Sequence, residues 1–301
     1  MESRETEIRH AYDGSTVAFR ALEGCGWRDL VNLGFYPLHE LPGLVFGLER
    51  FQKALARRSI ALVEPRPGLH VLDVGCGRGF TTASLAALGC DALGLDLLEE
   101  NVALARAHHG ASGARFGVAD ATRLPATVAG VDLADGSQDA IHCLEAGFHF
   151  GAKGRRAFLE EACRLLRPGG RLVLVDFVWR DAHPEAIERL DPHRLVRDTW
   201  CFGEFEPLER YRANAAAVGL RERELLDWTV PVIDRFQKIG ETIARVGTWR
   251  AGRAVLRTFR PGLAQLEPAE WAFLVELMRA HDAVRRASRY VALVFEKPGA
   301  R

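Results

Sequence analysis

The 301-residue sequence predicts an α/β fold in which helices cover both faces of a mostly parallel sheet. Three observations lead to this prediction. Short apolar runs bounded by glycine or acidic residues alternate with amphipathic stretches of about 10–15 residues. Hydrophobic residues make up 48% of the chain, which is enough to bury a sizeable core. A late segment, from Pro231 to about Arg286, has helical patterning throughout and is too long to be a simple connection.

The alternation of strand and helix begins after an N-terminal region that ends near Glu64. A helix is expected at 48–63, because its apolar residues have helical spacing and PRPG follows at 65–68. Buried strands are then expected at 70–74, 92–96, 114–120, 139–144 and 171–179. Helices are expected between them at 80–89, 98–110 and 155–166. This order predicts βαβ units and therefore a parallel sheet.

The second half of the chain is less regular. We expect an irregular insertion at 180–203, a helix at 207–220, a strand at 221–230 and a closing strand at 289–298. The predicted sheet therefore has seven strands. The predicted division is an N-terminal helical lid (1–64), a core (65–230), a helical cap inserted late in the chain (231–287) and the closing strand of the core (288–301).

Composition argues against several classes of function. Forty basic residues balance forty acidic ones, so no net charge favours nucleic acid as a partner. The six cysteines are scattered without CxxC pairs or metal-ligand spacing, which predicts reduced thiols and no metal site. The charged N-terminus has no apolar core of a signal peptide, and no apolar run is long enough to span a membrane. We therefore expect a cytoplasmic protein without a membrane span; the sequence leaves open whether it forms a homodimer.

The strongest motif lies at the end of the first strand, where Asp73-Val-Gly-Cys-Gly-Arg-Gly leads into a helix. Alternate glycines let the backbone approach a ligand closely, and the helix N-terminus offers N–H groups to a carboxylate. A nicotinamide dinucleotide fingerprint would place its third glycine at Phe80, one residue after Gly79. The spacing therefore favours a nucleoside that carries an amino acid over a dinucleotide, and argues against an oxidoreductase.

VLDVGCGRGF resembles motif I of the class I S-adenosylmethionine-dependent methyltransferases, and ACRLLRPGGRLVLVDF resembles their later helix, turn and strand. The resemblance spans about residues 69–180 and implies a Rossmann-like fold, S-adenosyl-L-methionine as cofactor and S-adenosyl-L-homocysteine as product. It implies that the acid and glycines hold the amino-acid end, that Asp96 binds the ribose, and that Asp120 lies near the adenine. The expected cofactor site comprises Asp73, Gly75, Cys76, Gly77, Gly79, Asp96, Leu97, Asp120, Ala121 and Leu144.

Outer segments resemble the small-molecule methyltransferases, a group that includes tocopherol, sterol and polyketide-tailoring enzymes. CLEAGFHF is similar to an E-x-x-x-H segment of that group, and Asn32-Leu-Gly-Phe-Tyr36 is similar to part of its lid. The chain lacks the Asn/Asp-Pro-Pro-aromatic motif of base methyltransferases at this point. The resemblance implies O-methylation of a small apolar metabolite in secondary metabolism. Alternatives are C-methylation of an isoprenoid or related alkene, or use of the cofactor to promote a cyclisation.

His149 is the best candidate for a general base, because imidazole titrates near neutral pH, and Glu145 is expected to orient it or the substrate. A structural role, in packing or backbone hydrogen bonding, is the alternative for both residues. His142 lies within a strand and is expected to be core. The expected substrate contacts are aromatic residues of the lid and of the segment after the fifth strand: Tyr12, Tyr36, Trp179 and Trp200.

Overall fold

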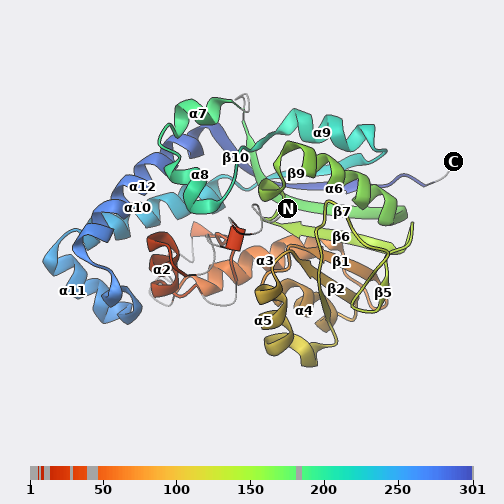
Figure 1. Ribbon diagram of the computed structural model, residues 1–301, viewed down its shortest axis with the longest axis horizontal. Helices are drawn as coiled ribbons and strands as arrows, with labels where there is room; N and C mark the ends of the chain where they lie inside the picture. Colours follow the sequence, from red (N-terminus) through yellow and green to blue (C-terminus); the bar gives the residue numbers. More distant parts are fainter. Residues whose placement is uncertain are drawn as a thin grey trace.

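The computed structural model describes residues 6, 8–9, 14–27, 30–38, 47–180 and 185–299. One large sheet crosses the molecule with helices on both faces, and a lobe of helices lies beside it (Figure 1). The strands follow the order β3-β2-β1-β6-β7-β10-β9, and the short β8 (Glu206–Pro207) pairs with the end of β7. These findings confirm the predicted α/β fold with a seven-stranded main sheet; β8 was not predicted.

Five neighbouring strands run parallel, as the βαβ pattern predicts: β1 (His70–Val74), β2 (Asp91–Asp96), β3 (Arg115–Val118), β6 (Gln138–Leu144) and β7 (Leu166–Trp179). The last strand, β10 (Ser288–Glu296), lies antiparallel between β7 and β9 (Arg221–Asp227). A small hairpin of β4 (Thr127–Val128) and β5 (Val131–Asp132) stands apart. The parallel strands bring their carboxyl ends to one edge of the sheet, and this edge carries the site.

The two faces of the sheet are built by strict alternation along the strands. Val71 of β1 belongs to the core under α3 (Glu49–Val63), α10 (Arg235–Gly247) and α12 (Pro268–Ala287). Leu72, the next residue, belongs to the core under α6 (Gly151–Leu165) and α9 (Leu208–Ala217). The helices α4 (Phe80–Ala87) and α5 (Glu99–His109) follow β1 and β2. Burial on both faces explains why these strands are continuously apolar.

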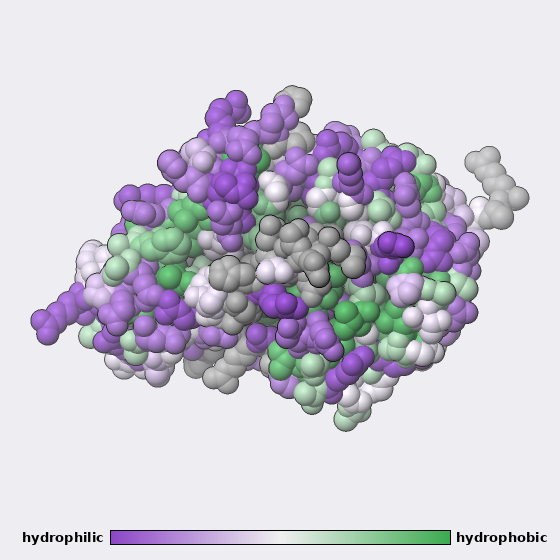
Figure 2. All heavy atoms as spheres, in the orientation of Figure 1, coloured by the Kyte–Doolittle hydropathy of each residue, from purple (hydrophilic) through white to green (hydrophobic). Residues whose placement is uncertain are grey.

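The helical lobe is formed by α2 (Val17–Gly24), α10, α11 (Arg250–Phe259) and α12 (Figure 1). Helices α10 and α12 pack closely, because Gly247 leaves room for the indole of Trp271; a Cβ at Gly247 would lie 1.9 Å from that ring. Helix α12 starts with a capping box between Glu267 and Glu270. On the face that Figure 2 shows, hydrophilic side chains are spread over both the sheet and the lobe.

The segment 180–203 was expected to be irregular, and the structure corrects this. Two short helices, α7 (Ala186–Leu190) and α8 (Leu195–Trp200), lie within it. The buried carboxylate of Asp191 accepts hydrogen bonds from the backbone N–H groups of Val196 and Arg197 at the start of α8. Helices of five or six residues have too few turns to produce a periodic apolar pattern, so the sequence did not reveal them.

Candidate active site

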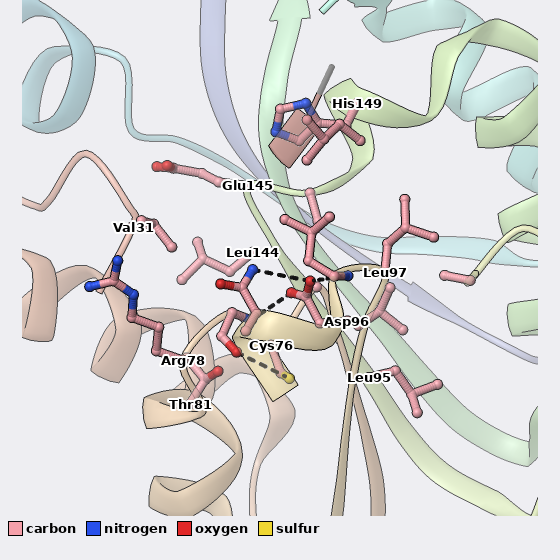
Figure 3. Close-up of a pocket in the computed structure, with 18 of the residues that line it drawn as sticks. Val31, Cys76, Arg78, Thr81, Leu95, Asp96, Leu97, Leu144, Glu145 and His149 are labelled. Atoms are coloured by element: carbon pink, nitrogen blue, oxygen red, sulfur yellow. Dashed lines mark hydrogen bonds between the residues drawn. The ribbon is translucent and has the colours of Figure 1, made fainter. Parts of the chain in front are cut away.

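A cleft opens at the carboxyl ends of β1, β2, β3 and β6, with about 1000 Å³ of empty space when the part open to solvent is included (Figure 3). In Figure 3, Asp96 lies at the middle of the cleft, and Glu145 and His149 lie on one side of it. Most of the residues predicted to hold the cofactor line this cleft: Gly75, Cys76, Gly77, Asp96, Leu97, Asp120, Ala121 and Leu144. Asp73 and Gly79, also predicted, lie behind its lining.

The loop between β1 and α4 needs glycine for conformation and for space. Gly75, Gly77 and Gly79 have φ angles of 69°, 52° and 92°, in the left-handed region that favours glycine. A Cβ on Gly75 would lie 2.4 Å from the Cβ of Ala146, so the backbone there touches the loop after β6. The N–H groups of Gly75 and Cys76 donate to the carbonyl of Leu95, which ties the loop to β2. The loop from β1 to α4 is therefore held in a fixed position between β2 and the loop that follows β6.

Asp73 anchors this loop from behind. Its side chain is buried, and its Oδ2 accepts hydrogen bonds from the hydroxyls of Thr81 (2.5 Å) and Thr82 (2.6 Å) in the first turn of α4. Its Oδ1 lies 2.7 Å from Nδ1 of His142, whose Nε2 lies 2.9 Å from the Ser59 hydroxyl of α3. His142 is fully buried, in agreement with its expected place in the core. The sequence missed the two threonines, although hydroxyls directly after a glycine-rich turn are a usable signal for such an anchor.

Asp96 joins the loop to β2 and α5. Its Oδ2 accepts a hydrogen bond from the N–H of Gly77 (2.9 Å), and its Oδ1 accepts from the N–H of Leu98 (3.0 Å) and the amide of Asn101 (3.1 Å). Burial raises the pKa of its carboxyl above the usual value. A carboxylate has about four acceptor positions, so one remains for a ligand hydroxyl at the cleft.

Asp120, two residues after β3, also lines the cleft. Its Oδ1 accepts hydrogen bonds from the N–H (2.9 Å) and the hydroxyl (2.7 Å) of Thr122, which fixes the turn after β3. Its Oδ2 has no hydrogen-bond partner among the residues described. Leu97, Ala121 and Leu144 supply apolar surface beside it. Two carboxylates, an apolar slot and a glycine-rich loop before a helix N-terminus fit a nucleoside that carries an amino acid.

Glu145 follows β6 in a strained conformation. Its φ is 52°, which is uncommon for a residue with a side chain. Its carboxylate accepts hydrogen bonds from the Tyr290 hydroxyl of β10 (2.5 Å) and from the N–H of Leu33 (3.1 Å) in the N-terminal region. Burial raises the pKa of Glu145 to about 8, so the carboxyl is largely protonated at neutral pH. A strained backbone conformation that the surrounding structure maintains next to a ligand cleft is typical of functional sites.

His149 lies in the short helix Gly147–Phe150 that leads into α6. Its Nδ1 donates a hydrogen bond to the carbonyl of Cys201 (2.8 Å), since a carbonyl can only accept. In the neutral ring, Nε2 is therefore the nitrogen that can take a proton. The predicted pairing of Glu145 with His149 is not formed in the described part of the chain. Cys201, rather than Glu145, orients the imidazole.

An aromatic cavity adjoins the cofactor cleft and shares Val31 and Glu145 with it. Six aromatic rings line it: Trp27, Phe148, Phe177, Trp200, Phe202 and Phe205. The rings of Phe202 and Phe205 are stacked 4.5 Å apart, and Phe148 meets Phe177 edge to face at 5.4 Å. A further cavity, lined by apolar residues of α2, α10 and α12, shares Trp200 with the aromatic one. The lining thus changes from mixed polar and apolar in the cleft, to aromatic in the adjoining cavity, to apolar in the third.

Of the four residues expected to contact the substrate, Trp200 lines the aromatic cavity. Tyr36 is fully buried, stacks on Phe51 at 4.6 Å and donates its hydroxyl to the carbonyl of Leu33 (2.7 Å). Trp179 is also fully buried, packs against Phe205 with ring centroids 5.1 Å apart, and is not among the residues that line the cavity. Tyr12 lies outside the described residues. Packing in the core, which the sequence pattern does not resolve, decides where these rings point.

Two further structural features bear on the class of protein. In the described ranges, no three His, Cys, Asp or Glu side chains come together in a way that would hold a metal ion. None of the helices within those ranges has both the length and the apolar character that a bilayer crossing requires.

Comparison with known proteins identifies the family. Residues 71–170 match the model of a family described as "Methyltransferase domain". The chain is 32% identical over 231 residues to the methyltransferase GfsG of Streptomyces halstedii, covering 73% of this chain and 75% of that protein. It is 32% identical over 190 residues to the 2-methyl-6-phytyl-1,4-hydroquinone methyltransferase of Synechocystis sp., covering 61% of this chain. The match spans 57% of the length of that relative.

The fold is also shared with solved structures. The geranyl diphosphate C-methyltransferase of Streptomyces coelicolor A3(2), solved with Mg²⁺, geranyl diphosphate and S-adenosyl-L-homocysteine, superposes with a TM-score of 0.64. The superposition covers 98% of this chain and 97% of that one at 17% identity. The shared fold therefore extends over the helical lobe as well as the sheet.

Proposed function

Because the chain belongs to the class I S-adenosylmethionine-dependent methyltransferases, we propose that it methylates a hydroxyl group of a small apolar metabolite. The observation that carries this proposal is the aromatic cavity that adjoins the cofactor cleft at Glu145. A cavity walled by six aromatic rings favours a flat or multi-ring apolar acceptor over a charged one. The balanced charge of the chain agrees with an acceptor that needs no electrostatic steering.

S-adenosyl-L-methionine, when bound, supplies a methyl group on a positively charged sulfur. The glycine loop, Asp96 and Asp120 would hold its amino-acid, ribose and adenine parts. The chain must then align the acceptor oxygen and keep water away from it. The aromatic rings around the second cavity exclude water from the acceptor.

His149 is the group that we assign to proton removal. Cys201 holds Nδ1–H, so Nε2 can accept the proton of an acceptor hydroxyl as the oxygen becomes nucleophilic. Glu145 lies where the two cavities meet and is tied to Tyr290 and Leu33. We assign it an orienting role: it holds the lid segment against the loop after β6, and its protonated carboxyl can donate a hydrogen bond to an acceptor oxygen.

Two features support the class of acceptor and the cellular setting that we propose. The named substrate of the Synechocystis relative is a hydroquinone, which is an aromatic ring with hydroxyl groups. All six cysteines are free thiols, which suits the reducing cytoplasm. We place the enzyme in the cytoplasm on the second of these grounds.

The test replaces His149 with Ala and with Gln and measures transfer of labelled methyl groups to a panel of hydroxylated aromatic acceptors. Loss of a general base should lower turnover roughly 100-fold or more, with binding of S-adenosyl-L-homocysteine unchanged in calorimetry. His193→Ala, a change at an exposed histidine outside the cavities, is the matched control. Turnover at the wild-type rate in both His149 variants would refute the assignment. Mass spectrometry and NMR of the product then show whether oxygen or carbon carries the methyl group.

A further inference from the structure

The imidazole of His281 lines the aromatic cavity, and its second nitrogen has no partner among the residues that the structure describes. His281 of α12 lies among the residues that line the cavity, and its side chain is nine-tenths buried. Its Nδ1 lies 2.7 Å from Oε1 of Gln237 on α10. For Nε2, on the other edge of the ring, the described residues supply no hydrogen-bond donor or acceptor.

The contacts of Gln237 determine which nitrogen of His281 carries the proton. The amide nitrogen of Gln237 donates to the carbonyl of Met278 (2.7 Å) and to Glu241 (2.7 Å), so its Oε1 faces the imidazole as an acceptor. Nδ1 of His281 must then be the protonated nitrogen. Nε2 carries a lone pair, and it is this edge of the ring that the cavity can reach.

The imidazole keeps this form across the physiological pH range. Burial, together with the nearby positive charge of Arg285, lowers the pKa of His281 to about 4. A neutral ring with Nδ1–H fixed by Gln237 presents a permanent hydrogen-bond acceptor. Because His281 lines the open cavity, a ligand that brings its own donor can form a hydrogen bond with this nitrogen.

Most of the other polar groups of the cavity are already used within the protein. The buried Nε1 of Trp200 has no partner among the described residues, but it can only donate a hydrogen bond. Arg285 is paired with Asp282 and Asp234, and the Ser288 hydroxyl donates to the carbonyl of Arg285 (3.1 Å). Glu145 accepts from Tyr290 and Leu33. Nε2 of His281 is therefore an acceptor in the described lining that a donor on a ligand can reach. It lines the aromatic cavity but not the cofactor cleft, so a hydroxyl held there is not the one that receives the methyl group.

We propose that Nε2 of His281 is a specificity determinant that accepts a hydrogen bond from a second hydroxyl of the substrate. The substrate class is then an apolar ring compound with two separated hydroxyl groups, one methylated beside Glu145 and His149 and one bound at His281. This inference rests on the proposed function for the identity of the cavity as the acceptor site. The hydrogen bond itself can be observed without any methyl transfer.

The experiment compares 2-naphthol with 2-methoxynaphthalene, which keeps the rings and the oxygen but lacks the donor. Calorimetry is carried out on the full chain without S-adenosyl-L-methionine, so no turnover occurs. We expect 2-naphthol to bind about tenfold more tightly, equivalent to ~1.4 kcal/mol. In the His281→Phe variant this preference should fall to about twofold or less, and His281→Gln, which keeps an acceptor near Nε2, should restore part of it.

Val284→Ala is the control, because Val284 lines the same cavity from the same helix and should weaken both probes equally. A ¹⁵N spectrum of histidine-labelled wild-type protein supplies a second readout if His281→Phe does not fold. The Nε2 signal of His281 should shift with 2-naphthol and not with 2-methoxynaphthalene. An unmoved signal, or a hydroxyl preference that survives in folded His281→Phe, would overturn the proposal. If the signal shifts but no hydroxyl is ever methylated, the proposed function fails and this inference stands.

Discussion

Replacing Asp73 separates two explanations of how an acid before the glycine loop supports cofactor binding. The sequence resemblance implies that Asp73 helps hold the amino-acid end of the cofactor. The structure instead directs its two oxygens to Thr81, Thr82 and His142, all behind the cleft. Asp73→Ala removes the partner of three buried polar groups. Asp73→Asn can replace it: its amide oxygen can accept from the threonines, and its NH₂ can donate to Nδ1 of His142 when the ring carries its proton on Nε2, facing the Ser59 hydroxyl.

The magnitude follows from these contacts. Removing one partner of a buried, hydrogen-bonded charge pair typically costs about 3–5 kcal/mol. The threonine hydroxyls can regain part of this free energy by donating to backbone carbonyls of their own helix instead. We therefore expect Asp73→Ala to lower the free energy of unfolding by roughly 3 kcal/mol. Asp73→Asn should cost about 1 kcal/mol or less. Urea denaturation of the full chain measures both values.

Calorimetric titration with S-adenosyl-L-homocysteine tests the functional consequence. If Asp73 acts only as an anchor, Asp73→Asn should bind with an affinity within about threefold of the wild type, a difference of ~0.6 kcal/mol. If its negative charge contacts the ligand ammonium group, Asp73→Asn should lose about tenfold or more in affinity while remaining stable. That second outcome would refute the anchoring role and restore the explanation based on resemblance.

Two further predictions concern the same edge of the sheet. Gly75→Ala should lower the free energy of unfolding by about 2–3 kcal/mol in urea denaturation, since its Cβ would lie 2.4 Å from that of Ala146. Gly77→Ala, with a similar φ but its nearest neighbour 3.3 Å away, should cost about 1 kcal/mol, and equal losses would contradict this. Burial raises the pKa of Asp176 to about 7, so the folded state holds a proton that the unfolded state releases, and stability falls as pH rises from about 4 to 7. The free energy of unfolding of Asp176→Asn, measured relative to wild type, should therefore increase by roughly 2–3 kcal/mol between about pH 5 and pH 8. A difference between the two proteins that does not change with pH would exclude this ionisation.

Most of the residues that the sequence predicts for the cofactor come together at one cleft, because their placement depends on local chemistry. The positive φ angles of the loop require glycine, and Asp96 and Asp120 each end or follow a strand with a clear apolar pattern. The partners of Asp73 could not be predicted in the same way. His142 lies opposite Asp73 in the register of β1 and β6, a pairing that becomes known only with the strand order.

The acceptor half depends on contacts between distant segments, and there the sequence is less informative. Aromatic residues near the site are equally suited to lining a cavity or filling a core. Trp200 lines the cavity, whereas Tyr36 and Trp179 are enclosed by neighbouring rings. Tyr290 was not predicted at all, because its contact with Glu145 depends on β10 returning to the sheet between β7 and β9. The same applies to His281, whose role depends on the packing of α12 against α10.

The strained residue Glu145 explains why the two halves act as one unit. Its left-handed conformation costs on the order of 1–3 kcal/mol, and the hydrogen bonds from Tyr290 and Leu33 offset this cost. The next residue, Ala146, contacts the backbone of Gly75 in the cofactor loop. A chain that followed β6 with a relaxed residue would direct this loop elsewhere and separate the cofactor surface from the aromatic cavity. The strain is therefore the structural means by which the acceptor cavity is fixed against the cofactor cleft.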